Sequence, residues 1–138
     1  MACGIMLLLD THVLIWLDEG NPRLGNMALR TIIESLAAGQ LGVATISFWE
    51  VAMLIEKQRL TMQTELEVWR SDLLQTGLLE IPFRGTTALR AGQLRMFHGD
   101  PADRMIVATA IENGATLMTA DTKILSWNTL HQKIDARQ

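Results

Sequence analysis

The stretch LLLDTHVLIW, residues 7–16, decides the fold class of this 138-residue chain. Residues 5–9 form an uninterrupted apolar run, the pattern of a strand that is buried on both faces of a parallel sheet. The run stops at Asp10, and apolar side chains then recur at helical spacing from Val13 to Leu17. An acid that directly follows a buried strand is costly to desolvate unless it has a partner. The stretch therefore predicts a buried strand, a carboxylate with a partner and a short helix, in that order.

The rest of the chain repeats this alternation of apolar runs and helical patterns. Further strands are predicted at residues 41–45, 78–83 and 115–119, with a short fifth strand at 130–134. Helices are predicted at residues 27–37, from Ser47 to Ile55, at 66–74, at 86–97 and from Pro101 to Gly114. Strands separated by helices imply right-handed crossovers. The predicted fold is therefore α/β, with three layers and a mostly parallel central sheet of four to five strands flanked by helices.

Length and composition predict a single domain, residues 1–138, with its own hydrophobic core. The chain is 49% hydrophobic and 20% charged, which is typical of a soluble globular protein. The single cysteine, Cys3, has no partner for an internal disulfide, which suits a reducing cytoplasm, and we expect it to be buried in the first strand. Residues 1–9 lack a basic segment and stop well short of a membrane span, so we expect a cytoplasmic protein with no membrane partner.

The net charge of −3 argues against a protein that holds nucleic acid through a broad basic face. The distribution of charge matters as much as the balance. If five of the 15 acids share one metal site, the remaining surface carries fewer acids than the 12 Lys and Arg. A bound metal would add local positive charge, so modest contacts to phosphate remain compatible with the composition.

Four short acidic signatures stand where apolar runs stop: DTH at 10–12, SFWE at 47–50, DPADR at 100–104 and TAD at 119–121. In an open α/β sheet, acids that follow separate strands, or open the helices after them, gather at one crevice. Two carboxylates about 4 Å apart repel by roughly 4 kcal/mol at an effective dielectric near 20. Such a cluster is tenable only if it is protonated or holds a hard cation. The sequence therefore predicts a site for Mg²⁺ or Mn²⁺, which prefer oxygen ligands.

Each acid also has a purely structural explanation. Ser47 and Glu50 fit a capping box, in which both side chains satisfy backbone groups at a helix start. Asp100 before Pro101 is a common N-cap arrangement, and an acid at Asp103 complements the positive end of the helix dipole. The acid of the last signature would likewise serve as a cap. Local sequence leaves capping and catalysis open at these positions.

Taken in order, the four signatures resemble those of the PIN-domain ribonucleases, and among them the VapC toxins of bacterial toxin–antitoxin pairs. The resemblance covers nearly the whole chain and rests on LLLDTHVLIW at 7–16, SxWE at 47–50, DPxDRMIVATA at 100–110 and LMTAD at 117–121. It implies a PIN-like fold. Ala102 and Ile124 depart from the family pattern, because aromatic side chains are frequent at both positions. Neither is a carboxylate, so the departures bear on packing more than on chemistry.

The resemblance implies roles for the acids. It identifies Asp10, Glu50, Asp103 and Asp121 as catalytic. The metal ligands would be Asp10, Asp103 and Asp121, with Asp100 nearby as a further ligand or as a holder of water. The implied cofactor is Mg²⁺ or Mn²⁺.

Several neighbours of the acids would support them. Hydrogen bonds from Thr11 and Thr119 would orient carboxylates, and Ser47 would cap the helix and support Glu50. His12 is placed to approach substrate. Arg104 would either contact a phosphate or form an ion pair within the acidic cluster.

The ligand type predicts hydrolysis by a metal-activated water that attacks a phosphodiester in line and leaves a 5′-phosphate and a 3′-hydroxyl. The resemblance implies that the substrate is RNA and that the chain forms a homodimer. It also implies a separate antitoxin that binds an apolar groove, blocks the acids and connects the protein to DNA only indirectly. Exposed Trp or Leu side chains between Val51 and Leu74 are candidates for that groove, whereas Trp69 could equally belong to the core.

Two other functions share an acidic pocket. A metal-dependent phosphatase or phosphotransfer domain is expected to carry Asp-x-Asp after its first strand, which DTH at 10–12 lacks, or an acid after a central strand with a late Lys. A non-catalytic partner-binding module is expected to have lost at least one of the four acids, whereas all four are present.

Overall fold

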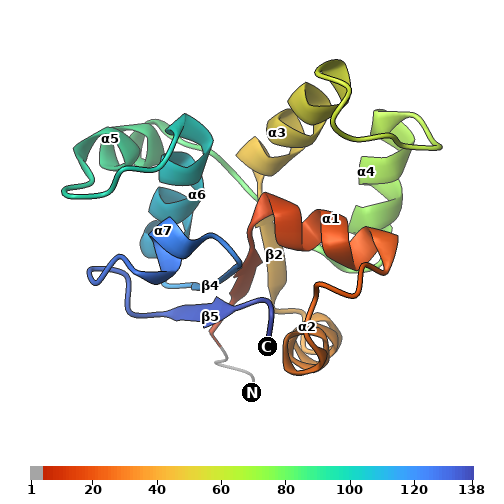
Figure 1. Ribbon diagram of the computed structural model, residues 1–138, viewed down its shortest axis with the longest axis horizontal. Helices are drawn as coiled ribbons and strands as arrows, with labels where there is room; N and C mark the ends of the chain where they lie inside the picture. The colour runs from red at the N-terminus through yellow and green to blue at the C-terminus, as the bar shows by residue number, and fades with distance from the viewer. Residues whose placement is uncertain (1–4) are drawn as a thin grey trace.

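The computed structural model describes residues 5–138, so the burial expected for Cys3 lies outside the described residues (Figure 1). Five strands form one sheet in the order β3-β2-β1-β4-β5. The strands are β1 (Leu7–Leu9), β2 (Leu41–Ala44), β3 (Leu79–Ile81), β4 (Thr116–Thr119) and β5 (Lys133–Asp135). Each neighbouring pair is parallel, so the sheet is parallel throughout rather than mostly so.

The central strand explains why the run at residues 7–9 is apolar at every position. Leu9 contributes to a core shared with Val13 and Ile32, whereas Leu8 contributes to a second core with Ile106 and Leu117. Successive side chains of a strand point to opposite faces, so a strand covered on both faces needs apolar residues throughout. The three-layer α/β fold predicted from the sequence is confirmed.

Seven helices cover the two faces of the sheet in the described chain. They are α1 (Thr11–Glu19), α2 (Asn26–Ala37), α3 (Thr45–Glu56), α4 (Leu66–Gln75), α5 (Gly85–Gln93), α6 (Pro101–Glu112) and α7 (Thr122–Leu125). Figure 1 shows α1 to α4 grouped to the right of the sheet and α5 to α7 to its left. Trp69 of α4 is buried in the core of the first group, so it belongs to the core and not to an exposed groove.

Several predicted boundaries were wrong for physical reasons. The third helix begins at Thr45, directly after β2, and not at Ser47. The helix predicted at 86–97 ends at Gln93, because Phe97 is buried as part of a loop. Ile5 lies outside β1 and is 57% exposed.

Near the end of the chain, the fifth strand lies at Lys133–Asp135, three residues later than predicted at its start, because the apolar Leu130 is buried in a loop. The short α7 was not predicted, since four residues are too few to establish a period. Among residues 5–138, no helix combines the length and the apolar character that crossing a membrane requires.

The strand order fixes where a site can lie. The chain moves from β1 outward to β2 and β3, and then returns to place β4 on the other side of β1. In parallel sheets, ligands bind outside the carboxyl ends of the strands at such a reversal. Asp10 directly follows β1 at this point, and its backbone N–H donates to the carbonyl of Met118 in β4 (3.0 Å).

Candidate metal centre

The five acids singled out in the sequence line one cleft of about 390 Å³ at the carboxyl ends of β1 and β4: Asp10, Glu50, Asp100, Asp103 and Asp121. They come from separate elements. Asp10 and Asp121 follow β1 and β4, Glu50 lies in the second turn of α3, Asp103 lies in the first turn of α6, and Asp100 directly precedes α6. The fold therefore brings together acids that are far apart in the chain. His12 lies at the rim of the same cleft and is exposed.

Asp10 is held by hydrogen bonds on both carboxylate oxygens. Its Oδ1 accepts from the backbone N–H of Thr11 (2.8 Å), which makes it the N-cap of α1, and its Oδ2 accepts from the Thr119 hydroxyl (2.6 Å). The side chain is only 5% exposed. Burial raises the pKa of Asp10, and these two hydrogen bonds oppose the rise because they favour the charged form. Thr119 thus makes the orienting contact expected of it.

Glu50 does not take part in a capping box, contrary to one reading of the sequence. The helix begins two residues before Ser47, and no side chain caps it. Ser47 is fully buried, and its hydroxyl oxygen accepts from the Thr11 hydroxyl (2.9 Å), which joins α1 to α3. Among the described residues, Glu50 Oε1 is buried without a hydrogen-bond partner. Burial raises the pKa of Glu50, and the charge of Asp10 adds to the rise.

Asp100 is the N-cap of α6, as the sequence predicted. Its Oδ1 accepts from the backbone N–H of Asp103 (2.9 Å), and Pro101 occupies the first position of the helix. Asp103 lies in the first turn, where burial and then the charge of Asp100 raise its pKa from 3.8 to about 7. One carboxylate oxygen each from Glu50, Asp100 and Asp103 lie within 4.8 Å of one another.

Asp121 caps the short α7 by accepting from the backbone N–H of Lys123 (2.8 Å). Its own backbone N–H donates to the Thr119 hydroxyl (3.0 Å), which in turn donates to Asp10. Thr119 therefore connects the two acids at the strand ends. Asp10 and Asp121 line the cleft but are not members of the three-carboxylate group.

Among the described residues, Arg104 forms no ion pair with the acids. Its guanidinium donates to three backbone carbonyls, those of Ala91 (2.9 Å), Leu94 (2.9 Å) and Phe97 (2.6 Å). These contacts join α6 to the end of α5 and to the loop that follows it. Its neighbour Asp103 lines the cleft. Of these two adjacent residues, Arg104 therefore stabilises the fold and Asp103 belongs to the candidate site.

Sequence reasoning missed two residues of the cleft wall, Trp16 and Arg137. Arg137 is close to the last residue of the chain, where no apolar pattern marks it. Its guanidinium forms a bidentate pair with Asp135, with both N–O distances at 3.0 Å. Among the described residues, the ion pair of Arg137 is therefore with Asp135 and not with the acids of the cleft.

The residues present fit a hard divalent cation. Three carboxylates share a space small enough for one ion, and one buried oxygen of Glu50 lacks a partner among the described residues. A buried polar atom without a hydrogen bond is unusual and calls for an ion or water. The all-oxygen donor set matches Mg²⁺ or Mn²⁺.

This combination of a parallel α/β sheet and an acidic cleft is that of the PIN domain, whose family model matches residues 7–126. The chain belongs to the PIN-domain family and, within it, to the VapC type. It is 38% identical over 120 residues to a protein named Ribonuclease VapC22 from Mycobacterium tuberculosis, a match that covers 86% of this chain and 89% of that protein.

Solved structures share the fold at lower identity. A structure of FitAB bound to a DNA fragment matches with a TM-score of 0.67 and 22% identity, covering 96% of both chains. A structure of VapBC2 from Rickettsia felis, bound to a DNA fragment from its promoter, matches with a TM-score of 0.66 and 20% identity. That match covers 94% of this chain and 96% of the other.

Proposed function

We propose that this protein is a metal-dependent endoribonuclease and the toxin of a toxin–antitoxin pair. The observation that carries the proposal is the convergence of Glu50, Asp100 and Asp103 within 4.8 Å of one another. A related protein that covers most of the chain is named a ribonuclease, which supports RNA as the substrate. The presence of all five acids in one cleft favours catalysis over a module that only binds a partner.

In this proposal, Glu50, Asp100 and Asp103 hold Mg²⁺ or Mn²⁺, with Asp10 and Asp121 facing the same cleft. The ion would supply a Lewis acid that activates water for attack on a phosphodiester. Thr119 and the Thr11 backbone hold Asp10 in one orientation, so its carboxylate is preorganised. Without a cation the clustered acids repel a phosphate, so RNA binding at the cleft depends on the metal.

Two solved neighbours, from Klebsiella pneumoniae and Rickettsia felis, are described as a toxin–antitoxin complex and as VapBC2 on promoter DNA. We propose that this chain likewise binds an antitoxin, reaches DNA only through it, forms a homodimer and acts in the cytoplasm. Trp49 of α3 and Val68 of α4 are 53% and 47% exposed. Val68 lies between Val51 and Leu74, the region in which exposed Trp or Leu side chains were expected to bind the antitoxin, and Trp49 lies just before that region. We propose these two side chains as candidates in place of Trp69.

The direct test incubates purified protein with single-stranded RNA in Mg²⁺, in Mn²⁺ and in EDTA, beside p-nitrophenyl phosphate. We expect RNA cleavage with either metal and none in EDTA. Asp103→Asn should abolish cleavage, whereas Asp72→Asn, on the exposed surface of α4, should not. Hydrolysis of p-nitrophenyl phosphate with intact RNA would instead identify a phosphatase. Cleavage by protein carrying Asp103→Asn would reject the metal centre.

A further inference from the structure

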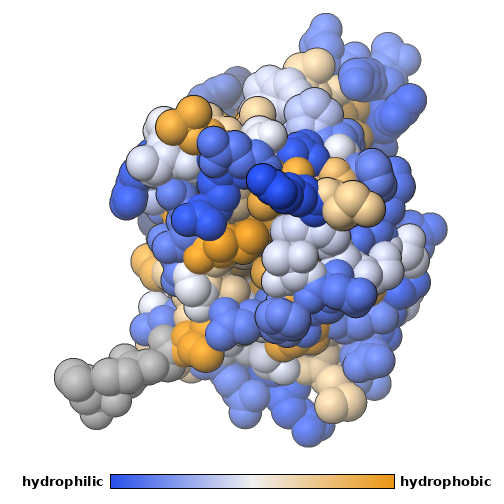
Figure 2. Space-filling view, turned by 90° about the vertical axis from the view of Figure 1, so that its left-hand side faces the viewer, coloured by the Kyte–Doolittle hydropathy of each residue, from blue (hydrophilic) through white to orange (hydrophobic). Residues whose placement is uncertain are grey.

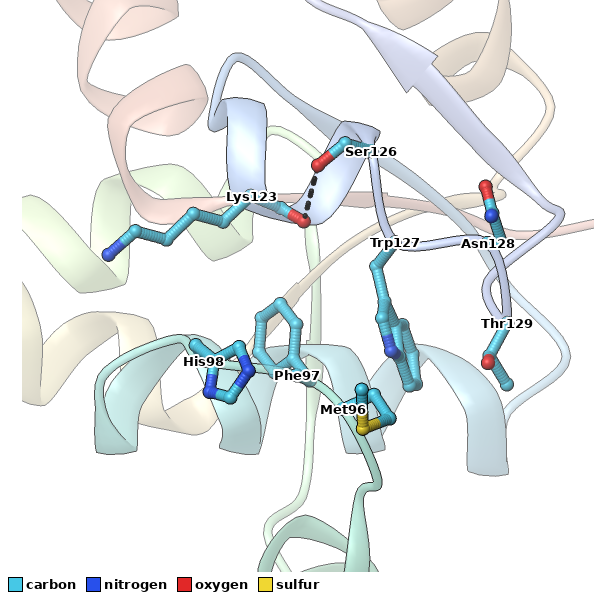
Figure 3. A pocket seen from close by; sticks show the side chains of 8 residues that line it. All are labelled: Met96, Phe97, His98, Lys123, Ser126, Trp127, Asn128 and Thr129. Carbon is cyan, nitrogen blue, oxygen red and sulfur yellow. Dashed lines mark hydrogen bonds between the residues drawn. The ribbon is translucent and has the colours of Figure 1, made fainter.

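A second cavity, of about 340 Å³, lies beside the acidic cleft, between α7 and the loop after α5. Figure 3 shows the rings of Phe97, His98 and Trp127 gathered in it together with the Met96 side chain. The Lys123 side chain extends from α7 on the same side as His98. Figure 2 shows the face of the molecule that carries α5 and α7, on which groups of hydrophobic side chains lie among hydrophilic ones.

The charge of this cavity is opposite to that of the cleft. The two segments that form it belong to residues 81–99 and 122–134, which contain no Asp or Glu. Of the residues that line the cavity, Lys123 and His98 are basic and none is acidic. Among the described residues, the Lys123 ammonium and the His98 ring form no hydrogen bond or salt bridge. A negatively charged ligand would therefore meet the Lys123 ammonium in this cavity and repelling carboxylates only in the neighbouring cleft.

The cavity is held open by side-chain contacts to backbone. Trp127 Nε1 donates to the carbonyl of Arg95 (3.1 Å), and Arg104 donates to the carbonyl of Phe97 (2.6 Å). The rings of Phe97 and Trp127 pack with their centroids 5.3 Å apart. Met96 is 82% exposed at the rim. Its backbone φ is 60°, a conformation that residues other than glycine rarely adopt. The wall of the cavity is thus preformed, and Met96, its residue with a strained backbone, is exposed to solvent.

Gly99 forms a thin wall between the cavity and the cleft. A Cβ atom built on Gly99 would lie 2.6 Å from the Phe97 ring and 2.9 Å from Cβ of Asp103. Only glycine therefore lets the floor of the cavity approach the acids so closely. On the other side, Lys123 follows Asp121 by two residues and is joined to it by the capping hydrogen bond. The cavity therefore lies next to the acids Asp103 and Asp121.

We propose that the cavity binds the nucleotide of single-stranded RNA next to the phosphate that is cleaved. Lys123 contacts the phosphate of that nucleotide, and the exposed Met96 side chain, which lies over the buried rings of Phe97 and Trp127, contacts its base. Base contacts to aromatic and apolar side chains combined with backbone contacts from cations are the usual way to hold single strands. This inference rests on the proposed function, because it places the nucleotide relative to the cleaved phosphate.

The first test measures binding and does not need cleavage. A short fluorescent single-stranded RNA is titrated by anisotropy in Ca²⁺, with a gel to verify that it stays intact. Lys123→Gln should raise Kd about fivefold at 0.1 M salt and reduce the slope of log K against log salt by about 0.7, the value for one lost phosphate contact. Lys57→Gln, at the far end of α3, is the matched control and should leave Kd and slope unchanged.

The second test separates the base contact from the phosphate contact. Met96→Gly removes the rim side chain and suits the backbone conformation, so the fold should be kept while Kd for the oligomer rises. In cleavage with Mn²⁺, Lys123→Gln should raise KM more for an oligomer than for a dinucleotide, which has no second phosphate to reach Lys123.

The outcomes distinguish this inference from the proposed function. Equal RNA affinity of the wild type and Lys123→Gln, or no RNA binding by the wild type, would overturn the subsite. RNA binding that depends on Lys123, without cleavage in Mg²⁺ or Mn²⁺, would support the subsite and contradict the endoribonuclease proposal.

Discussion

At the strand ends, the Asp10 carboxylate accepts hydrogen bonds from Thr11 and Thr119 on both oxygens, whereas on the helix side of the cleft Glu50 Oε1 is buried without a partner among the described residues. One wall of the cleft is therefore satisfied by the protein itself. The other wall, formed by Glu50, Asp100 and Asp103, gathers carboxylates that repel one another. The difference indicates that the strand-end wall is stabilised by hydrogen bonds within the protein, whereas the helix-side wall is suited to bind a cation. Loss of a carboxylate from the helix-side wall should lower activity, and loss of a hydroxyl from the strand-end wall should lower stability.

The largest effect is expected from Glu50→Gln. Glutamine keeps the shape but removes the charge, so metal binding weakens and RNA cleavage should fall by about two orders of magnitude or more. The free energy of unfolding of metal-free protein should not fall, because one repelling charge is removed. Cleavage rates and urea unfolding curves measure the two quantities. A variant as active as wild type would assign Glu50 a structural role only.

Metal should stabilise the protein in a pH-dependent way. The pKa of Asp103 is 3.8 when unfolded and about 7 when folded, so its contribution to stability is complete below about pH 4 and is lost as pH rises through 7. Asp10 and Glu50 are shifted in the same direction. Mn²⁺ at about 100 times its Kd should add about 2.7 kcal/mol above pH 7 and less at pH 5, where protons compete. A Tm that does not change on addition of Mn²⁺ between pH 5 and above pH 7 would contradict a metal site shared by these carboxylates.

Thr119→Val tests the strand-end wall. The substitution keeps the side-chain shape but removes the donor to Asp10 and the acceptor for the Asp121 backbone, inside a fully buried site. We expect the free energy of unfolding to fall by about 2 kcal/mol, since a buried charged group loses its hydrogen bond. Thr31→Val, an exposed-helix control on α2, should cost less. Equal losses would show that Thr119 has no special role.

The smallest effect is expected from Ser47→Ala. The Ser47 hydroxyl accepts a hydrogen bond from Thr11 and does not cap α3, so about 1 kcal/mol should be lost and most cleavage activity retained. Measured helix content should stay the same, because the helix starts at Thr45. A loss of most cleavage activity in a variant that is destabilised by only about 1 kcal/mol would instead place Ser47 in the catalytic machinery.

The sequence predicted the fold class and the meeting of the acids because both follow from where apolar runs stop. Asp10 and Asp121 each follow a buried strand, and parallel strands bring such ends to one edge. The N-cap role of Asp100 was also readable, because Pro101 marks a helix start.

Other features depend on tertiary contacts that local patterns do not encode. The DPADR signature suggested a cation near the acids, but Arg104 turns toward the carbonyls of a loop whose course no periodicity specifies. The spacing of Ser47 and Glu50 fits a capping box, but the two residues do not form one. The reason is that α3 follows β2 without a linker and begins at Thr45, two residues before Ser47. Arg137 reaches the cleft only because β5 pairs with β4 at the edge of the sheet.

The most direct test of the metal centre is an anomalous difference map from a crystal soaked in Mn²⁺. We predict a peak among the carboxylates of Glu50, Asp100 and Asp103, with oxygen distances near the roughly 2.1 Å typical of small hard cations. The peak should vanish in Asp103→Asn. A cleft without anomalous density at saturating Mn²⁺, or a peak bound away from these three side chains, would contradict the assignment.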